Sequence, residues 1–280
     1  MRKLFFISLV LIMALLGGGS SAKEKGHLLI IGGGAKPPDA LVEFVTLSRS
    51  GHILIITSAS GEPESYGPAV VEQFKQAGAK NVHWLHIDSP EMANADSVVT
   101  RIESSTGIFF TGGIQERLMQ RLGGTRSEAA VATLYFEKGG IIGGTSAGAA
   151  VMSEVMITGN ELINKDTTDV FFTIQAGNIE TKPGFGFLKK VIIDQHFIAR
   201  KRHNRLISLV LEHPKLAGIG IDEDTAILVS PDDSFRVIGT GSVVIYDARK
   251  AKSVRMDQSG LLAGQGLTMS ILLAGDKFRL

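Results

Sequence analysis

The sequence predicts a single α/β domain built on a mostly parallel β-sheet with helices on both faces. Three observations carry this prediction. Short and nearly continuous apolar runs alternate with longer segments whose apolar residues recur at helical spacing. Gly- or Ser-rich turns separate the two kinds of segment, and such apolar runs are typical of strands covered on both faces. Strands that alternate with helices pair in parallel through right-handed crossovers.

The first two thirds of the chain repeat this alternation of apolar runs and helical segments. We expect strands at residues 27–31, 52–56, 82–87, 107–110 and 140–142. We expect helices between them at residues 41–47, 69–77, 92–102 and 128–136.

The pattern changes after about Lys189. The apolar segments there are residues 191–193, 216–221, 226–229, 235–238 and 242–246, and only residues 202–212 keep a helical pattern. Several of these segments are joined by short turns, so we expect antiparallel additions to the same sheet. The polar stretch 158–182 has no clear pattern, and a loop of this size in a compact domain is usually functional.

The first 22 residues have the pattern of a secretory signal peptide. Arg2 and Lys3 form a basic start, and an apolar stretch runs from residue 4 to residue 16. This stretch is shorter than the roughly 20 residues that a transmembrane helix needs. Ser20 and Ala22 stand at positions suited to signal cleavage. We therefore expect cleavage after Ala22, export to the periplasm or the medium, and one mature domain of residues 23–280.

Composition excludes several classes of function. The chain carries 29 basic and 28 acidic side chains, which gives no electrostatic reason to expect binding to nucleic acid or to an anionic membrane. It has no cysteine, so disulfides and a lipid-modified cysteine are both excluded. An uncleaved membrane anchor is the alternative to a cleaved leader.

The strongest local signal is GGTSAGAA at residues 143–150, directly after an expected strand. A serine between small residues at a strand-to-helix turn can form a nucleophile elbow, which indicates Ser146 as a nucleophile. The helix that begins at Ala147 would direct its free amides at a developing oxyanion. A close-packed turn or a phosphate-binding loop is the alternative, although no Lys-Ser or Lys-Thr follows the glycines as in a Walker loop.

A second turn, TGGIQ at residues 111–115, also follows an expected strand and opens a helix. Parallel neighbours would bring it to the same edge of the sheet, where α/β proteins bind ligands. The amide of Gly113 would then be a second oxyanion donor, and Gln115 would contact substrate. An ordinary turn that ends a strand is the alternative.

A serine nucleophile needs a base, and His196 has the best setting of the seven histidines. It follows the apolar run 191–193, so it should lie at the end of a strand. A structural role is the alternative. The third partner should be a carboxylate at another strand end, where Asp222, Glu223 and Asp224 stand in a row. Strand alternation places Glu223 on one side and the two aspartates on the other, and the sequence leaves that choice open.

Arg200, Arg202 and Arg205 follow the histidine closely. Arginine binds carboxylates through a bidentate fork, so these residues indicate a pocket for an acidic group of the substrate. A solvated helix face is the alternative.

Four of these segments together resemble a known family. FTGG with its following Gln, GGTSAGA, DQHF with the three arginines behind it, and GIGIDE are similar to segments of the cyanophycinases. These are serine peptidases of family S51, a group that also holds aspartyl dipeptidase. The resemblance runs from about His27 to the C-terminal LLAGDKFRL.

The resemblance implies a fold similar to class I glutamine amidotransferases, which is flavodoxin-like, with a serine in place of their cysteine. It implies Ser146 as nucleophile, His196 as base and Glu223 as the third member of the triad. The catalytic mechanism that the resemblance implies needs no metal or cofactor. The implied substrate pocket holds Gln115, Asp194, Gln195, Arg200, Arg202 and Arg205.

The family reaction is exopeptidase release of β-aspartyl-arginine dipeptides from cyanophycin, a poly-aspartate with arginine on its side chains. Ile114 stands where we expect Asn or Asp before the Gln, so the substrate is less firmly implied than the mechanism. The alternatives are an aspartyl or isoaspartyl dipeptidase of the same group, or a secreted binding protein without turnover. The expected partners are a peptide or cyanophycin-like polymer as substrate, no nucleic acid, no membrane after leader cleavage, and a possible homodimer.

Overall fold

The computed structural model of the chain describes residues 24–49, 51–163, 165 and 171–280. The expected leader, residues 1–22, lies outside the described residues. Within those ranges, none of the helices combines the length and the apolar character that a membrane span requires.

The main sheet has eight strands in the order β16-β11-β10-β1-β5-β4-β2-β3. The strands that pair in parallel are β1 (His27–Ile31), β5 (Ile141–Thr145), β4 (Gly107–Phe110), β2 (Ile53–Ile56) and β3 (Val82–Leu85). Antiparallel strands extend the sheet beyond β1, namely β10 (Thr225–Val229), β11 (Ser234–Gly239) and β16 (Lys277–Arg279). The predicted mostly parallel α/β fold is confirmed.

Helices cover both faces of this sheet because its central strands are apolar on both sides. On β1, Leu29 and Ile31 face one core and Leu28 and Ile30 face the other, as strand alternation requires. The first core is closed by α1 (Pro38–Leu47) and α2 (Pro63–Gln76). The second is closed by α3 (Pro90–Ala93), α4 (Asp96–Glu103), α5 (Gln115–Leu122), α6 (Arg126–Phe136) and α7 (Ala147–Ala150).

The C-terminal third builds a second sheet, which the sequence did not predict. Its order is β15-β12-β9-β8, formed by β15 (Thr268–Leu272), β12 (Val243–Asp247), β9 (Ala217–Ile221) and β8 (Val191–Gln195). β8 and β9 are parallel, whereas the other two pairs are antiparallel. The expectation that all these segments join the main sheet is therefore wrong, and only β10, β11 and β16 do so. Both β8 and β9 are buried along their whole length, so their hydrophobicity says nothing about which sheet they enter.

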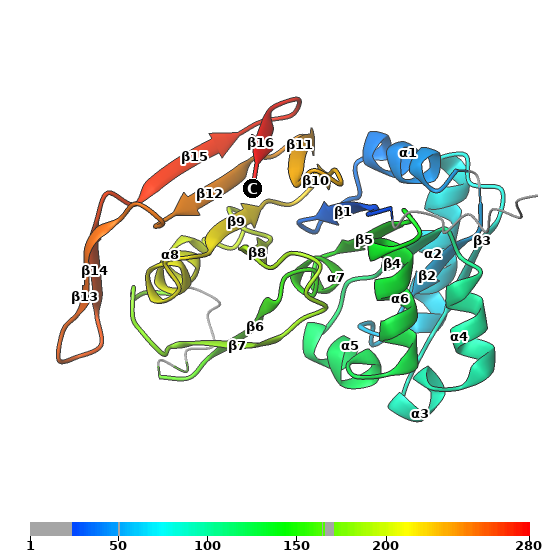
Figure 1. Cartoon of the computed structure of the whole chain (residues 1–280), viewed down its shortest axis with the longest axis horizontal. Helices are drawn as coiled ribbons and strands as arrows, with labels where there is room; N and C mark the ends of the chain where they lie inside the picture. Colours follow the sequence, from blue (N-terminus) through cyan, green and yellow to red (C-terminus); the bar gives the residue numbers. More distant parts are fainter. Residues whose placement is uncertain (1–23, 50, 164, 166–170) are drawn as a thin grey trace, which may run out of the picture.

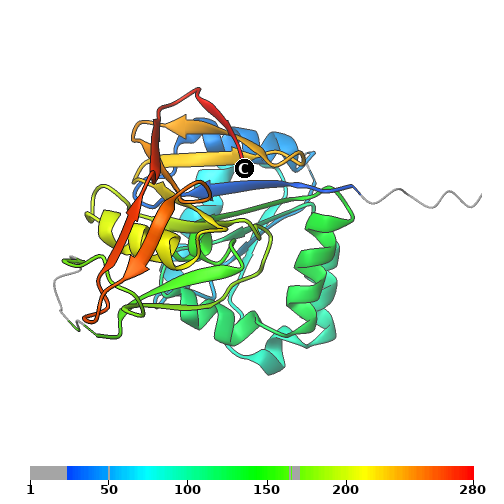
Figure 2. The same ribbon diagram turned by 60° about the vertical axis from the view of Figure 1, so that its left-hand side comes forward.

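The second sheet is continuous with the main core on one face and covered by α8 (His203–Glu212) on the other. Two smaller pairs complete the chain. One is β6 (Val155–Glu161) with β7 (Ile179–Pro183), and the other is the hairpin of β13 (Lys252–Met256) with β14 (Leu262–Gln265). The hairpin projects away from the main sheet beside α8 (Figures 1 and 2).

Candidate active site

Turns from both sheets meet at the carboxyl edge of the parallel strands. The turn after β1, residues 32–34, links them through its backbone. Its Gly32 carbonyl accepts a hydrogen bond from the His196 amide at 2.7 Å, and its Gly33 carbonyl accepts one from the Asp224 amide at 3.0 Å. The Ser146 amide donates to the carbonyl of Ile31 at 3.0 Å. The last residue of β1 and the glycine turn after it therefore hold the segments that follow β5, β8 and β9 around one point.

Ser146 stands between β5 and α7 in a strained backbone conformation, with φ 53° and ψ −109°. Such values are rare for a residue with a side chain and are found where surrounding structure enforces them. The flanking glycines provide that enforcement. A Cβ on Gly144 would lie 2.3 Å from the Gly148 carbonyl oxygen, and one on Gly148 would lie 2.3 Å from that of Phe110. Only glycine at these positions lets α7 approach the sheet closely enough to form the elbow.

The structure brings Ser146, His196 and Glu223 into one hydrogen-bonded chain. The Ser146 Oγ lies 2.9 Å from His196 Nε2, and Glu223 Oε1 lies 2.5 Å from His196 Nδ1. The neighbouring carboxylates are engaged elsewhere. Asp222 accepts hydrogen bonds from the amides of residues 198 and 199, and Asp224 accepts one from the amide of residue 35. Among the three carboxylates, the geometry therefore presents Glu223 to the histidine.

The environment of His196 keeps its imidazole neutral. Burial lowers its pKa, the hydrogen bond that it donates to Glu223 raises it, and the positive charges of Arg200 and Arg202 lower it further, with a net downward shift. The ring also packs against the glycine turn, since a Cβ on Gly33 would lie 2.2 Å from its Cε1 atom. A neutral imidazole whose Nδ1 donates to the carboxylate leaves Nε2 free to accept the serine proton.

The turn after β4 lies directly against the serine. A Cβ on Gly112 would be 3.4 Å from that of Ser146, and Gly113 has φ +137°. A Cβ on Gly113 would be 2.1 Å from the carbonyl oxygen of Ala59, to which the next amide donates at 3.0 Å. The turn that carries Gly113 therefore lies beside the elbow of Ser146 and Ala147.

A cleft of about 610 Å³ opens in front of the serine and the histidine. Its walls come from the turns after β1, β2, β4 and β5 and from the start of α2. Tyr66 of α2 forms one wall, where burial raises the pKa of its hydroxyl and a hydrogen bond with the Gly112 backbone lowers it, with a net upward shift. The residues that line the cleft are Gly33, Gly34, Ser60, Gly61, Glu62, Ser65, Tyr66, Ala69, Gly112, Gly113, Thr145, Ser146 and His196.

Most of the residues expected in the substrate pocket make contacts within the protein. Gln115 donates from Nε2 to the carbonyls of Ile157 and Thr158 at 2.9 and 2.6 Å, which fixes it to β6. Asp194 and Arg205 form a buried ion pair, in which Arg205 Nε donates to Asp194 Oδ2 at 2.7 Å and Nη2 contacts Oδ1. Their side chains are 0% and 2% exposed.

Of the remaining members of that set, two are buried and one is exposed. Arg202 is buried and donates from Nη1 to the carbonyl of Gln195 at 2.6 Å, so it braces the strand end that carries the histidine. Gln195 is itself buried. Arg200 alone is exposed, and it is near enough to affect the imidazole electrostatically. Of the three arginines, Arg200 is the one whose position suits contact with a ligand in the cleft.

Sequence reasoning missed the glycine turn after β1 and Tyr66. The signal for the first was present, because three consecutive glycines at residues 32–34 follow an apolar strand. Tyr66 carries no comparable mark, since it lies in an ordinary amphipathic helix. Within the part of the chain that the structure describes, no group of three His, Asp or Glu side chains could hold a metal ion.

Comparison with known proteins gives a consistent result. The sequence model of peptidase family S51 matches residues 17–238. The chain is 36% identical over 232 residues to the cyanophycinase of Thermosynechococcus vestitus, covering 81% of this chain and 69% of that protein. It is 37% identical over 239 residues to the cyanophycinase of Nostoc sp., covering 82% of this chain and 75% of that protein.

Solved structures agree on the fold. A peptidase from an acI-B1 Actinobacterium superposes with a TM-score of 0.67 at 20% identity, covering 93% of this chain and 99% of that one. A putative peptidase E protein from Listeria monocytogenes EGD-e superposes with a TM-score of 0.53 at 16% identity, covering 77% and 99%.

Proposed function

The chain belongs to peptidase family S51, and from that premise we propose that it is a secreted serine exopeptidase acting on cyanophycin or related β-aspartyl peptides. Its products would be β-aspartyl-arginine dipeptides. Its curated relatives named above are cyanophycinases, and the chain covers more than two thirds of their length. The observation that carries the proposal is the chain of hydrogen bonds from Ser146 through His196 to Glu223 at a strained turn.

In the proposed mechanism, Ser146 attacks the scissile amide carbon while His196 takes the hydroxyl proton at Nε2. Glu223 holds the imidazole in the productive tautomer and stabilises the imidazolium that forms. The amides of Gly113 and Ala147 bind the oxyanion of the tetrahedral intermediate. His196 then gives its proton to the leaving amine. In the second half, water loses a proton to His196 and attacks the acyl-enzyme, which releases the acid product and restores the serine.

The proposal for the substrate draws on charge. A terminal β-aspartyl-arginine unit presents free carboxylates close to the scissile amide. Arg200 is exposed beside the histidine and is suited to bind one of them in a bidentate way. Ile114, which is 48% exposed at the turn after β4, places an apolar side chain near this edge. Ile114 would favour substrates in which the unit next to the terminal β-aspartyl-arginine tolerates an apolar contact.

The decisive experiment incubates the purified protein with cyanophycin and with a panel of small β-aspartyl peptides, and identifies products by mass. We expect β-aspartyl-arginine dipeptides, and we expect Ser146→Ala to abolish their release while its circular dichroism stays unchanged. Release of other aspartyl dipeptides alone would make the protein an aspartyl or isoaspartyl dipeptidase. Failure of a fluorophosphonate probe to label the wild-type serine would instead indicate a binding protein without turnover.

Secretion is a separate part of the proposal and has its own test. It rests on Arg2, Lys3 and the apolar stretch that follows them. N-terminal sequencing of the exported protein should find Lys23 as the first residue. A mature form that begins at Met1 and stays with the membrane fraction would contradict this part and leave the catalytic part intact.

A further inference from the structure

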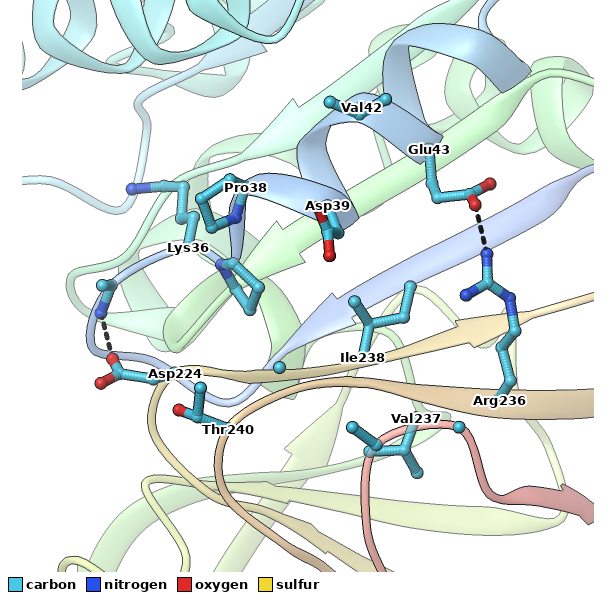
Figure 3. A pocket seen from close by; sticks show the side chains of 15 residues that line it. Lys36, Pro38, Asp39, Val42, Glu43, Asp224, Arg236, Val237, Ile238 and Thr240 are labelled. Carbon is cyan, nitrogen blue, oxygen red and sulfur yellow. Dashed lines mark hydrogen bonds and ion pairs between the residues drawn. The ribbon is translucent and has the colours of Figure 1, made fainter.

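Lys36 is a cation on the segment that leads from the catalytic cleft to α1, where it lines two pockets beside that helix. It lies on the turn between β1 and α1, two residues beyond Gly34, which lines the cleft together with Ser146. Its Nζ sits over the ring of Tyr66, 5.3 Å from the ring centroid. Figure 3 shows the side chain directed away from Asp224 and Ile238, with which Lys36 lines a pocket beside α1. Lys36 thus approaches the wall of the cleft that Tyr66 forms.

The ammonium group of Lys36 is partly buried, and burial is the one cause that shifts its pKa, lowering it to about 8. The charged groups on the neighbouring elements do not contribute to that shift. These are Asp39 and Glu43 on α1, Asp224 before β10, Arg236 on β11, and Glu62 and His196 in the lining of the cleft. Glu43 is paired with Arg236 at 2.5 Å, and Asp224 accepts the amide of residue 35. Among the described residues, no carboxylate therefore compensates the charge of Lys36.

We propose that Lys36 is a specificity-determining residue that binds a free carboxylate of the substrate at the Tyr66 side of the cleft. The inference rests on the proposed function for the class of substrate. A partly buried ammonium gains most from an anion that arrives with the ligand, because the desolvation of the cation has already occurred in the free protein. The ring of Tyr66 holds the cation from one face, as aromatic rings do, and leaves its remaining donors for the ligand.

The position of Lys36 complements that of Arg200. Arg200 follows β8 beside the histidine, whereas Lys36 follows β1 and reaches the wall that α2 provides. A substrate with two carboxylates near the scissile amide would then contact a cation from each sheet. A substrate with a single carboxylate would satisfy only one of them. This arrangement predicts preference for chain ends that carry more than one free carboxylate.

The proposal has a pH signature that a purely structural lysine would lack. Below pH 8 the amine is protonated and binds the carboxylate, and as pH rises through about 8 the free enzyme loses this charge. KM for a carboxylate-ended substrate should therefore increase above pH 8, whereas kcat should not. His196 and Tyr66 do not titrate in this window, because the pKa of the first is lowered from its ordinary value and that of the second is raised.

The test compares Lys36→Met and Lys36→Arg with wild type. The substrates are a short β-aspartyl-arginine oligomer with free terminal carboxylates and the same oligomer amidated. We expect Lys36→Met to lower kcat/KM on the free acid by about ten- to a hundredfold through KM, and to change the amidated substrate far less. Lys36→Arg should retain binding and abolish the rise of KM above pH 8. Lys75→Met, an exposed lysine on α2, is the matched control and should behave as wild type.

Direct binding separates this inference from the proposed function. The probe is the β-aspartyl-arginine dipeptide, titrated by calorimetry into Ser146→Ala with and without Lys36→Met. Weaker binding in the double variant supports the inference, even if the wild type shows no turnover and the proposed function fails. Equal loss on both substrates, or equal binding by both proteins, would overturn the inference while normal turnover left the proposed function standing. Absence of any binding and turnover would overturn both.

Discussion

Replacement of Arg205 by Ala should destabilise the fold rather than weaken substrate binding alone. Its guanidinium is 2% exposed and makes two contacts with the carboxylate of Asp194, which is 0% exposed. Asp194 also accepts the amide of Gln195 at 2.7 Å, so it cannot turn towards solvent without losing that bond. The variant would leave a fully buried carboxylate without its two-contact partner, with Arg202 Nη1 3.9 Å away.

The expected cost follows from the burial of both partners. Removing one member of a buried ion pair typically costs about 3–5 kcal/mol, because the other charge stays desolvated and unpaired. For a domain of this size, each kcal/mol lowers the melting temperature by roughly 2–4 °C. We therefore expect Arg205→Ala to melt roughly 6–20 °C below wild type. Loss of the contact between the guanidinium and the Phe171 ring, 4.9 Å from Cζ to the centroid, acts in the same direction.

Thermal and urea denaturation followed by circular dichroism measure this effect. Arg200→Ala is the matched control, because that side chain is exposed and its removal should change stability by no more than about 0.5 kcal/mol. Combining Asp194→Leu with Arg205→Met should recover part of the loss, since both buried charges are then gone. If Arg205→Ala melted with the wild type while KM for acidic substrates rose, the buried ion pair would be refuted. Arg205 would then contact substrate directly.

Three further predictions concern the catalytic chain. Gly33→Ala should lower kcat by about a hundredfold, because the new Cβ would lie 2.2 Å from the His196 ring and displacement of a catalytic group by about 1 Å can have that effect. Gly186→Ala is the control and should keep normal kcat, because Gly186 also has a positive φ but has open space around it. The acid limb of kcat/KM should lie below pH 6.5, because the pKa of His196 is lowered and only the neutral imidazole is a base. Arg200→Ala, assayed with an amidated substrate, should shift this limb to higher pH, because the positive charge of Arg200 lowers the pKa of His196. An acid limb above pH 6.5 in the wild type would contradict a lowered pKa of His196. Glu223→Gln should reduce kcat by about 10²–10⁴-fold with little change in melting temperature, and full activity would exclude it as the orienting carboxylate.

Much of the fold could be predicted because its signals are local. The apolar strands 27–31, 107–110 and the strand that precedes Ser146 each lie in the structure where periodicity placed them, within a few residues. The glycines around Ser146 also carried a readable meaning, because only a residue without a side chain fits where α7 meets the sheet. The leader at residues 1–22 stays a prediction, since it lies outside the described residues.

The arginines show where local reasoning stops. Spacing placed Arg200, Arg202 and Arg205 close behind the histidine, but it could not say which of them would be buried. Arg205 is buried against the carboxylate of Asp194 at the end of β8, and Arg202 Nη1 lies 3.9 Å from the same carboxylate. Arg202 is buried as well, whereas Arg200 is exposed. Helical periodicity describes the angular position of a residue, and it contains no information about an ion partner on another element.

The sequence by itself determined the alternation of strands and helices from β1 to β5, the elbow at Ser146 and the strand-end positions of His196 and the three carboxylates. Tertiary structure alone decided that β8 and β9 form a second sheet and that Glu223, rather than Asp222 or Asp224, reaches the histidine. It also decided that the glycine turn after β1 joins the two sheets through its carbonyls. The physical reason is the range of the forces involved. Backbone preference and hydrophobic periodicity act over a few neighbouring residues, whereas strand pairing, burial and charge partners depend on segments that only the folded chain brings together.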